Sequence, residues 1–197
     1  MISQDILEAI TPVVEAFEQL AVPYYIGGSV ASSVHGIPRT TLDADIIADL
    51  RIEHVQSFVE RLDPDYYVDA EMIAKAIERR SSFNVVYLAM ILKVDVFIFK
   101  GQLFDNEELK RAYPDTLDTT EGVSSRLFYL ASPEDTVLRK LEWYKMGGGV
   151  SERQWLDVLG VLKLQSKRLD MPYLRRWAAE LDVLDLLNRA LEDSGLR

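Results

Sequence analysis

Three aspartates have a spacing that could bring several carboxylates to one point of a β-sheet. Asp43 and Asp45 lie two residues apart in segment 42–48, which alternates as a β-strand does. Successive side chains of a strand point to opposite faces, so both carboxylates share one face, with their Cα atoms roughly 7 Å apart. Asp95 lies in the apolar segment 92–99, where an unpaired carboxylate would be costly. Carboxylate oxygens suit Mg²⁺, which proteins commonly share with substrate phosphates, so these residues predict a magnesium site.

A glycine-serine turn precedes these aspartates. Gly27, Gly28 and Ser29 follow a strand expected at 24–26 and open a helix expected at 29–35. Glycine lets backbone N–H groups approach a phosphate, the helix N-terminus favours its negative charge, and the serine hydroxyl adds a donor. Alone, such a turn is most often an ordinary helix start, and a lone Asp-x-Asp is most often a solvated surface. Their combination, followed by an aspartate in a later strand, favours a site for a nucleoside triphosphate and its metal ions.

The sequence around these residues resembles the signature of the polymerase-β-type nucleotidyltransferases. The similar segments are Ile26–Ser29, Arg39–Asp45 and Val94–Val96, so the resemblance covers residues 24–99. Within that superfamily the chain is most similar to the AbiEii-like toxin group and its small relatives. The resemblance implies an α/β (α+β) fold with a mixed β-sheet flanked by helices. It also implies transfer of a nucleoside monophosphate from an NTP, with release of pyrophosphate.

The resemblance further implies a role for each motif. Asp43 and Asp45 would bind two Mg²⁺ ions, for which Mn²⁺ could substitute. Asp95 would bind one of these ions and help to activate the acceptor hydroxyl, while the glycine-serine turn would contact the nucleotide. Such a mechanism is physically sound, because two cations about 4 Å apart can stabilise both the attacking and the leaving oxygen of an in-line displacement.

The elements that must position these residues change in character along the chain. Strand and helix patterns alternate up to residue 131, whereas helical periodicity alone follows. We therefore expect a catalytic α/β domain at 1–131 and a C-terminal helical region at 132–197 packed on it. The expected helices are 4–20, 29–35, 53–62, 70–79, 107–112, 133–145, 151–164, 171–180 and 181–193. The expected strands are 24–26, 42–48, 83–88, 92–99 and 127–131, with 83–88 and 92–99 forming an antiparallel hairpin.

Further candidates lie outside the strand motifs. Helical geometry places Lys140 beside an apolar stripe and Arg139 in solvent, and on spacing alone Lys140 is a side chain packed along that stripe. Asp157 follows Arg153 by one turn, which favours a surface ion pair. The AbiEii-like resemblance instead implies that Lys140 contacts a phosphate or base and that Asp157 orients it. Arg39 is a candidate phosphate or acceptor contact, and equally a partner for a nearby acid.

Composition narrows the class of protein and its partners. The chain has 197 residues, no cysteine and two histidines, which excludes disulfides and thiolate catalysis and disfavours a histidine-rich zinc site. Its net charge of −10 argues against general DNA binding, which needs a basic footprint. It shows no signal peptide and no apolar run near the roughly 18 residues of a membrane span. We therefore expect a cytoplasmic protein without a membrane partner.

The sequence leaves the acceptor open. A toxin-like enzyme would modify tRNA or another macromolecule and would pair with an antitoxin protein. An antibiotic-modifying enzyme would act on a small hydroxyl compound, and the acidic composition favours a cationic one such as an aminoglycoside. A third hypothesis is a non-catalytic nucleotide-binding protein with the same fold. The presence of all three aspartates together with the glycine-serine turn argues against that third hypothesis.

Overall fold

A computed structural model describes residues 2–62, 64–117 and 126–196. Within these residues, seven strands form one mixed sheet in the order β3-β4-β5-β2-β1-β7-β6. The strands are β1 (Tyr24–Ile26), β2 (Asp43–Ala48), β3 (Tyr66–Tyr67), β4 (Ser82–Tyr87), β5 (Leu92–Ile98), β6 (Tyr113–Thr116) and β7 (Leu127–Leu130). Because β2 pairs in parallel with β5 and antiparallel with β1, the strands that carry the aspartates are neighbours at the centre of the sheet.

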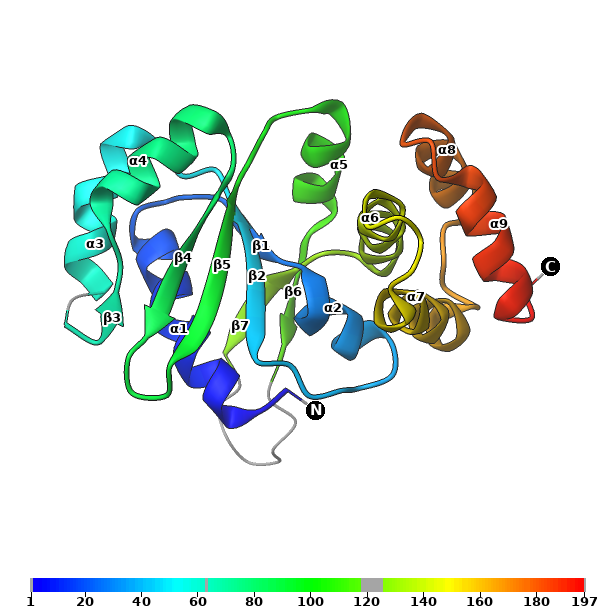
Figure 1. The fold of residues 1–197 in the computed structure, drawn as a ribbon, viewed down its shortest axis with the longest axis horizontal. Helices are drawn as coiled ribbons and strands as arrows, with labels where there is room; N and C mark the ends of the chain where they lie inside the picture. The colour runs from blue at the N-terminus through cyan, green and yellow to red at the C-terminus, as the bar shows by residue number, and fades with distance from the viewer. Residues whose placement is uncertain (1, 63, 118–125, 197) are drawn as a thin grey trace.

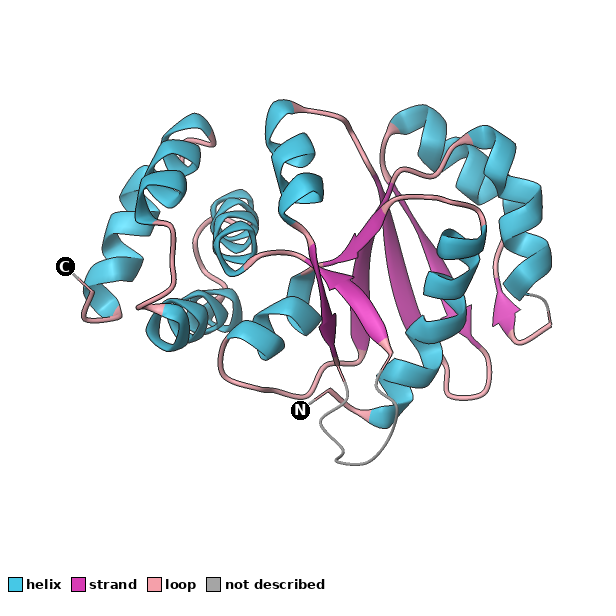
Figure 2. Cartoon of the chain, turned by 180° about the vertical axis from the view of Figure 1, so that it is seen from behind, coloured by secondary structure: helices cyan, strands magenta, loops and turns pink. Residues whose placement is uncertain are grey.

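Helices cover both faces of the sheet (Figure 1). One face is covered by α1 (Gln4–Gln19), a 3-10 turn (Ile52–His54), α3 (Val55–Leu62) and α4 (Ala70–Arg79). The other face is covered by α2 (Gly28–His35), α5 (Leu103–Arg111), α6 (Pro133–Met146) and α7 (Glu152–Gln165). An outer layer of α8 (Met171–Glu180) and α9 (Leu184–Asp193) packs on α6 and α7, away from the sheet (Figure 2).

Alternation along the central strands decides which face carries the aspartates. Ala44 and Ile46 of β2, with their register partners Val94 and Val96 of β5, are buried in a hydrophobic cluster shared with α1 and α3. The side chains between them must point to the opposite face, toward α2 and α6. Asp45 is one of these, so the pattern that buries the core also aims the carboxylates away from it.

The helices from α6 onward share a hydrophobic cluster of their own, to which α5 contributes Phe104. Ser132 caps α6 by accepting from the backbone N–H of Asp135, and Pro133 occupies its first turn, where a missing N–H costs nothing. Gly148 and Gly149, both at positive φ, follow the end of this helix. None of the described helices is both long and apolar enough to cross a membrane.

Most of the expected elements are present, with ends shifted by a few residues. Strand 24–26 and helices 70–79 and 171–180 have the expected bounds, and the 83–88/92–99 hairpin is antiparallel as expected. The helix expected at 107–112 begins earlier, at Leu103, where Gln102 and Asp105 form a capping box.

The last expected helix, 181–193, begins at Leu184, because Asp182 takes the left-handed backbone conformation. The sequence patterns missed β3 and β6. Both lie at edges of the sheet, and strands this short display no alternation to read.

Candidate active site

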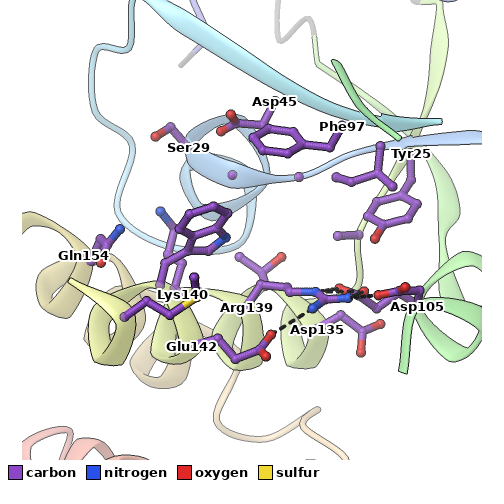
Figure 3. A pocket seen from close by; sticks show the side chains of 18 of the residues that line it. Tyr25, Ser29, Asp45, Phe97, Asp105, Asp135, Arg139, Lys140, Glu142 and Gln154 are labelled. Carbon is purple, nitrogen blue, oxygen red and sulfur yellow. Dashed lines mark hydrogen bonds and ion pairs between the residues drawn. The ribbon is translucent and has the colours of Figure 1, made fainter. Parts of the chain in front are cut away.

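A cavity of about 610 Å³ lies between the aspartate-bearing face of the sheet and helices α6 and α7 (Figure 3). Asp43 and Asp45 line it from β2, and the glycine-serine turn lines it from the start of α2. Arg39 and Lys140 reach it from the loop before β2 and from α6. Its volume is in the range of small-molecule sites, roughly 300–1,000 Å³. Most of the candidate residues therefore meet at one cavity, although they come from distant parts of the sequence.

The carboxylates of β2 and β5 crowd one another. Asp45 is the register partner of Asp95, and Asp43 is the partner of Lys93. Burial, together with the charges of Asp43 and Asp95, raises the pKa of Asp45 to about 6. Thr41 donates a 2.7 Å hydrogen bond to Asp43, while Lys93 Nζ lies 2.8 Å from a carboxylate oxygen of Asp95. This face of the sheet therefore has a negative potential that a bound cation would relieve.

The chemistry of these donors fits a hard cation, but the described residues hold no group of three or more Asp, Glu, His or Cys side chains already placed for a metal. Asp43 and Asp45 offer carboxylate oxygens to the cavity. Asp95 does not line the cavity, and its carboxylate is bound by Lys93 instead. A metal site that includes Asp95 therefore requires its carboxylate to exchange the lysine for the ion.

The glycine-serine turn is packed directly against β2. The backbone N–H of Gly27 donates to the carbonyl of Asp45 at 2.9 Å. Gly28 has a φ of 54°, and a Cβ built on it would lie 1.7 Å from a carboxylate oxygen of Asp45. Glycine is thus required here by both backbone conformation and space. The close packing brings the N-terminus of α2 beside the carboxylate of Asp45.

Arg39, Asp157 and Lys140 form an ion-pair network on the wall opposite the sheet. Arg39 donates to both carboxylate oxygens of Asp157, at 2.9 and 3.0 Å, and Lys140 Nζ donates to one of them at 2.7 Å. Burial opposes ionisation of Asp157, but the hydrogen bonds from Arg39 and Lys140 outweigh it, so the pKa of Asp157 is lowered. Arg39 also donates to the Ser29 hydroxyl at 2.6 Å, which joins the network to the glycine-serine turn.

This network shows which side chains Lys140 and Asp157 contact. Asp157 accepts a hydrogen bond from Lys140, while a contact of this pair with a nucleotide stays a prediction. The alternative surface ion pair between Arg153 and Asp157 is wrong for the part of the chain that the structure describes. Asp157 is buried and faces α6 and the loop of Arg39, whereas Arg153 lines the cavity.

The expectation that Arg139 points into solvent is also wrong. Its guanidinium forms ion pairs with Asp105 and Glu108 of α5 and with Glu142 of its own helix. A helical wheel of α6 contains no information about α5, which packs beside it and supplies the acids. Burial raises the pKa of Glu108 to about 8, although Arg139 acts in the opposite direction.

The sequence patterns did not identify two aromatic side chains that line the cavity. Phe97 of β5 and Trp143 of α6 line it and meet edge to face, with ring centroids 6.2 Å apart. Trp143 is 48% exposed. Phe97 shares the face of Asp95, two residues earlier, so strand alternation could have identified it. Trp143 lies one turn after Lys140, but nothing in its spacing distinguishes it from a core residue.

Comparisons with known proteins identify the fold. No family model matches the sequence, and no curated protein is significantly similar to it in sequence. Among solved structures, the chain is similar to the antibiotic-resistance factor ANT(2'')-Ia, with a TM-score of 0.52 and 15% identity over 96% of this chain and 94% of that one. It is also similar to an antigenic nucleotidyltransferase-like protein from Paracoccidioides brasiliensis, with a TM-score of 0.50 and 15% identity over 97% of this chain and 94% of that one. None of these comparisons places the chain in the AbiEii-like group. The mixed sheet and its flanking helices therefore form a nucleotidyltransferase-like fold.

Proposed function

We propose that the protein transfers a nucleoside monophosphate from an NTP to an acceptor hydroxyl group in a Mg²⁺-dependent reaction. One observation carries the proposal. Asp43 and Asp45 line the same cavity as the glycine-serine turn, and Gly28 is packed on the carboxylate of Asp45. A triphosphate bound at the N-terminus of α2 would thus lie beside paired carboxylates, as metal-assisted phosphoryl chemistry requires.

The cations of the cavity would hold the triphosphate. Lys140 and Arg39 are fixed by Asp157, and Arg153 and Gln154 of α7 also line the cavity. The side chains held by Asp157 are oriented before the nucleotide arrives, so binding loses less side-chain entropy. The ring of Trp143 offers a face against which a base or acceptor could pack.

Asp43 and Asp45 would hold Mg²⁺, or Mn²⁺ in its place, and Asp95 would join them once freed from Lys93. The metal would supply charge stabilisation for the attacking and leaving oxygens. The acceptor oxygen forms a new bond to the α-phosphorus while the bond from that phosphorus to the pyrophosphate oxygen breaks. A carboxylate oxygen of Asp95 takes the proton of the acceptor hydroxyl, so the charges and atoms balance.

The acceptor hypotheses from the sequence lead to different experiments. A toxin-like activity on tRNA, paired with an antitoxin protein, remains a proposal that rests on the sequence resemblance. ANT(2'')-Ia is described as an antibiotic-resistance factor, and this supports testing antibiotics as acceptors, although fold similarity does not transfer activity. A non-catalytic nucleotide-binding role would leave NTP binding without transfer.

The test is incubation of the protein with each α-labelled NTP and Mg²⁺, separately against total tRNA, a protein lysate and aminoglycosides. The proposal expects label in one acceptor class, and expects Asp43→Ala to abolish it without unfolding the protein. Circular dichroism and thermal unfolding of the variant control for its fold. Full activity in Asp43→Ala would refute the assignment of the site.

A further inference from the structure

The cavity has a second end that the nucleotide chemistry does not use. Four acidic side chains line it there: Asp105 and Glu108 from α5, and Asp135 and Glu142 from α6. We name these residues the acidic end. In Figure 3 Asp135 and Asp105 lie on the far side of Arg139 from Lys140 and Gln154, whereas Glu142 lies on the near side, and the hydroxyl of Tyr25 points toward Asp105. The acidic end is thus continuous with the proposed nucleotide site but separate from its aspartates.

The acidic end has more carboxylates than the cations that pair with it can neutralise. Arg139 pairs with Asp105, Glu108 and Glu142. The carboxylate of Asp135 lies 3.6 Å from Arg111, which also pairs with a further acid, Glu134, at 2.8 Å.

Glu108 and Asp135 are both fully buried. Burial raises the pKa of each of them, that of Glu108 to about 8. A ligand cation would offset part of the deficit of positive charge.

A second observation, independent of charge, also favours a ligand at this place. Thr136 lines the cavity and is 3% exposed, and its hydroxyl has no hydrogen-bond partner among the described residues. It lies on α6, one helical turn before Arg139 and Lys140. An enclosed hydroxyl without a partner forgoes a hydrogen bond that a bound polar group could supply.

We propose that the acidic end binds the acceptor, and that the acceptor is a small compound bearing at least one protonated amine beside its hydroxyl groups. The amine would be held by Glu142, the most exposed carboxylate of the acidic end, and Thr136 would hydrogen-bond a polar group of the same molecule. A nucleic-acid acceptor would bring phosphates against these carboxylates, and like charges in an enclosed site repel strongly. That the bound compound is the acceptor rests on the proposed function, whereas binding of a protonated amine at the acidic end does not.

The test measures binding without any nucleotide, by calorimetry on the full chain. The probes are kanamycin, a small polyamine with several hydroxyl groups, and its fully N-acetylated derivative, which keeps the hydroxyl groups but has no charge. We expect kanamycin to bind and the acetylated compound to bind at least about tenfold more weakly, which corresponds to about 1.4 kcal/mol. Equal affinity for both probes, or no binding of kanamycin, would overturn the proposal, as would binding of tRNA in competition with kanamycin.

Variants of the acidic end, compared with a control variant outside it, show whether kanamycin binds there. Glu142→Gln removes a partly exposed carboxylate of the acidic end, and Thr136→Val removes the hydroxyl while keeping the shape of the side chain. Glu107→Gln makes the same charge change on α5 at a residue that does not line the cavity. We expect the first two substitutions to weaken kanamycin binding several-fold and the control to leave it unchanged. Equal weakening by Glu107→Gln and Glu142→Gln would show a general charge effect and contradict the proposal.

The proposed function and this inference fail in different assays. Transfer of labelled nucleotide to tRNA, with no binding of kanamycin, would support the enzyme and overturn the amine-binding site. Binding of kanamycin that requires Glu142 and Thr136, without transfer from any NTP, would support the amine-binding site and contradict the nucleotidyltransferase.

Discussion

Replacing Gly28 by alanine tests the close packing of the glycine-serine turn on β2. Gly28 has a φ of 54°, and an added Cβ would lie 1.7, 2.6 and 2.8 Å from the Oδ2, Cγ and Cβ atoms of Asp45. Contacts this short require either the turn or Asp45 to move. Since both line the proposed triphosphate site, the substitution is expected to lower both the stability and the affinity for an NTP with Mg²⁺.

The expected magnitude has two parts. The left-handed backbone conformation costs a non-glycine residue roughly 1–2 kcal/mol. Overpacking of a filled space typically adds about 1–3 kcal/mol. Together they predict a loss of about 2–5 kcal/mol in the free energy of unfolding for Gly28→Ala.

Gly148→Ala provides the matched control for the backbone contribution alone. Gly148 has a φ of 75°, and a Cβ built on it has no atom within 4 Å. Urea denaturation should therefore show a loss of about 1–2 kcal/mol for Gly148→Ala, with unchanged NTP binding. If Gly28→Ala destabilises the protein no more than Gly148→Ala does, an added Cβ at Gly28 does not clash with Asp45.

The remaining predictions concern the network, the buried acid and the aromatic pair. Asp157→Asn removes the charge that pairs with Arg39 and Lys140, and breaking a buried pair costs about 3–5 kcal/mol. Because Arg39 is 24% exposed, we expect a value near the lower end in urea denaturation, and a loss below 1 kcal/mol would contradict the network's role.

Burial raises the pKa of Glu108 to about 8, so the folded state keeps a proton that the unfolded state, with a pKa near its usual value of about 4.3, releases. The free energy of unfolding should therefore fall as the pH rises from about 4.5 to 8. Urea denaturation at several pH values in this range should show a weaker fall in the Glu108→Gln variant. The same fall in the variant and in the unchanged protein would contradict this prediction. Trp143→Ala should lower the free energy of unfolding by about 0.5–1.5 kcal/mol through loss of the pair with Phe97. Calorimetry should also show weaker NTP binding by this variant. An unchanged affinity would show that Trp143 does not contact the nucleotide.

Strand alternation explains why so much of the aspartate face could be predicted. A strand that buries Ala44 and Ile46 must turn Asp43 and Asp45 to its other face, and this depends on local geometry alone. The pairing of β2 with β5 was not visible locally, but a later apolar strand containing Asp95 made a neighbouring position plausible. The turn before α2 was recognisable because its glycines and serine combine features that a phosphate site needs.

The contacts that could not be predicted join residues that are far apart in the sequence. Arg39 and Asp157 are separated by 118 positions, and no periodicity relates them. Arg139 looked exposed because its partners are on α5, and the position of α5 depends on the whole sheet. The ion pair of Lys93 with Asp95 shares a strand face and was visible in principle, since the residues are two apart.

Binding of NTP, measured with and without Mg²⁺, tests whether Asp43 helps to hold a metal-bound nucleotide, and the measurement needs no knowledge of the acceptor. Calorimetry would compare the intact protein with Asp43→Ala for each of the four NTPs. We expect at least one NTP to bind, with an affinity that falls at least about tenfold, or 1.4 kcal/mol, when Mg²⁺ is chelated or Asp43 is replaced. If no NTP binds, or if one binds equally well without Mg²⁺ and without the Asp43 carboxylate, the site described here does not hold a metal-bound nucleotide.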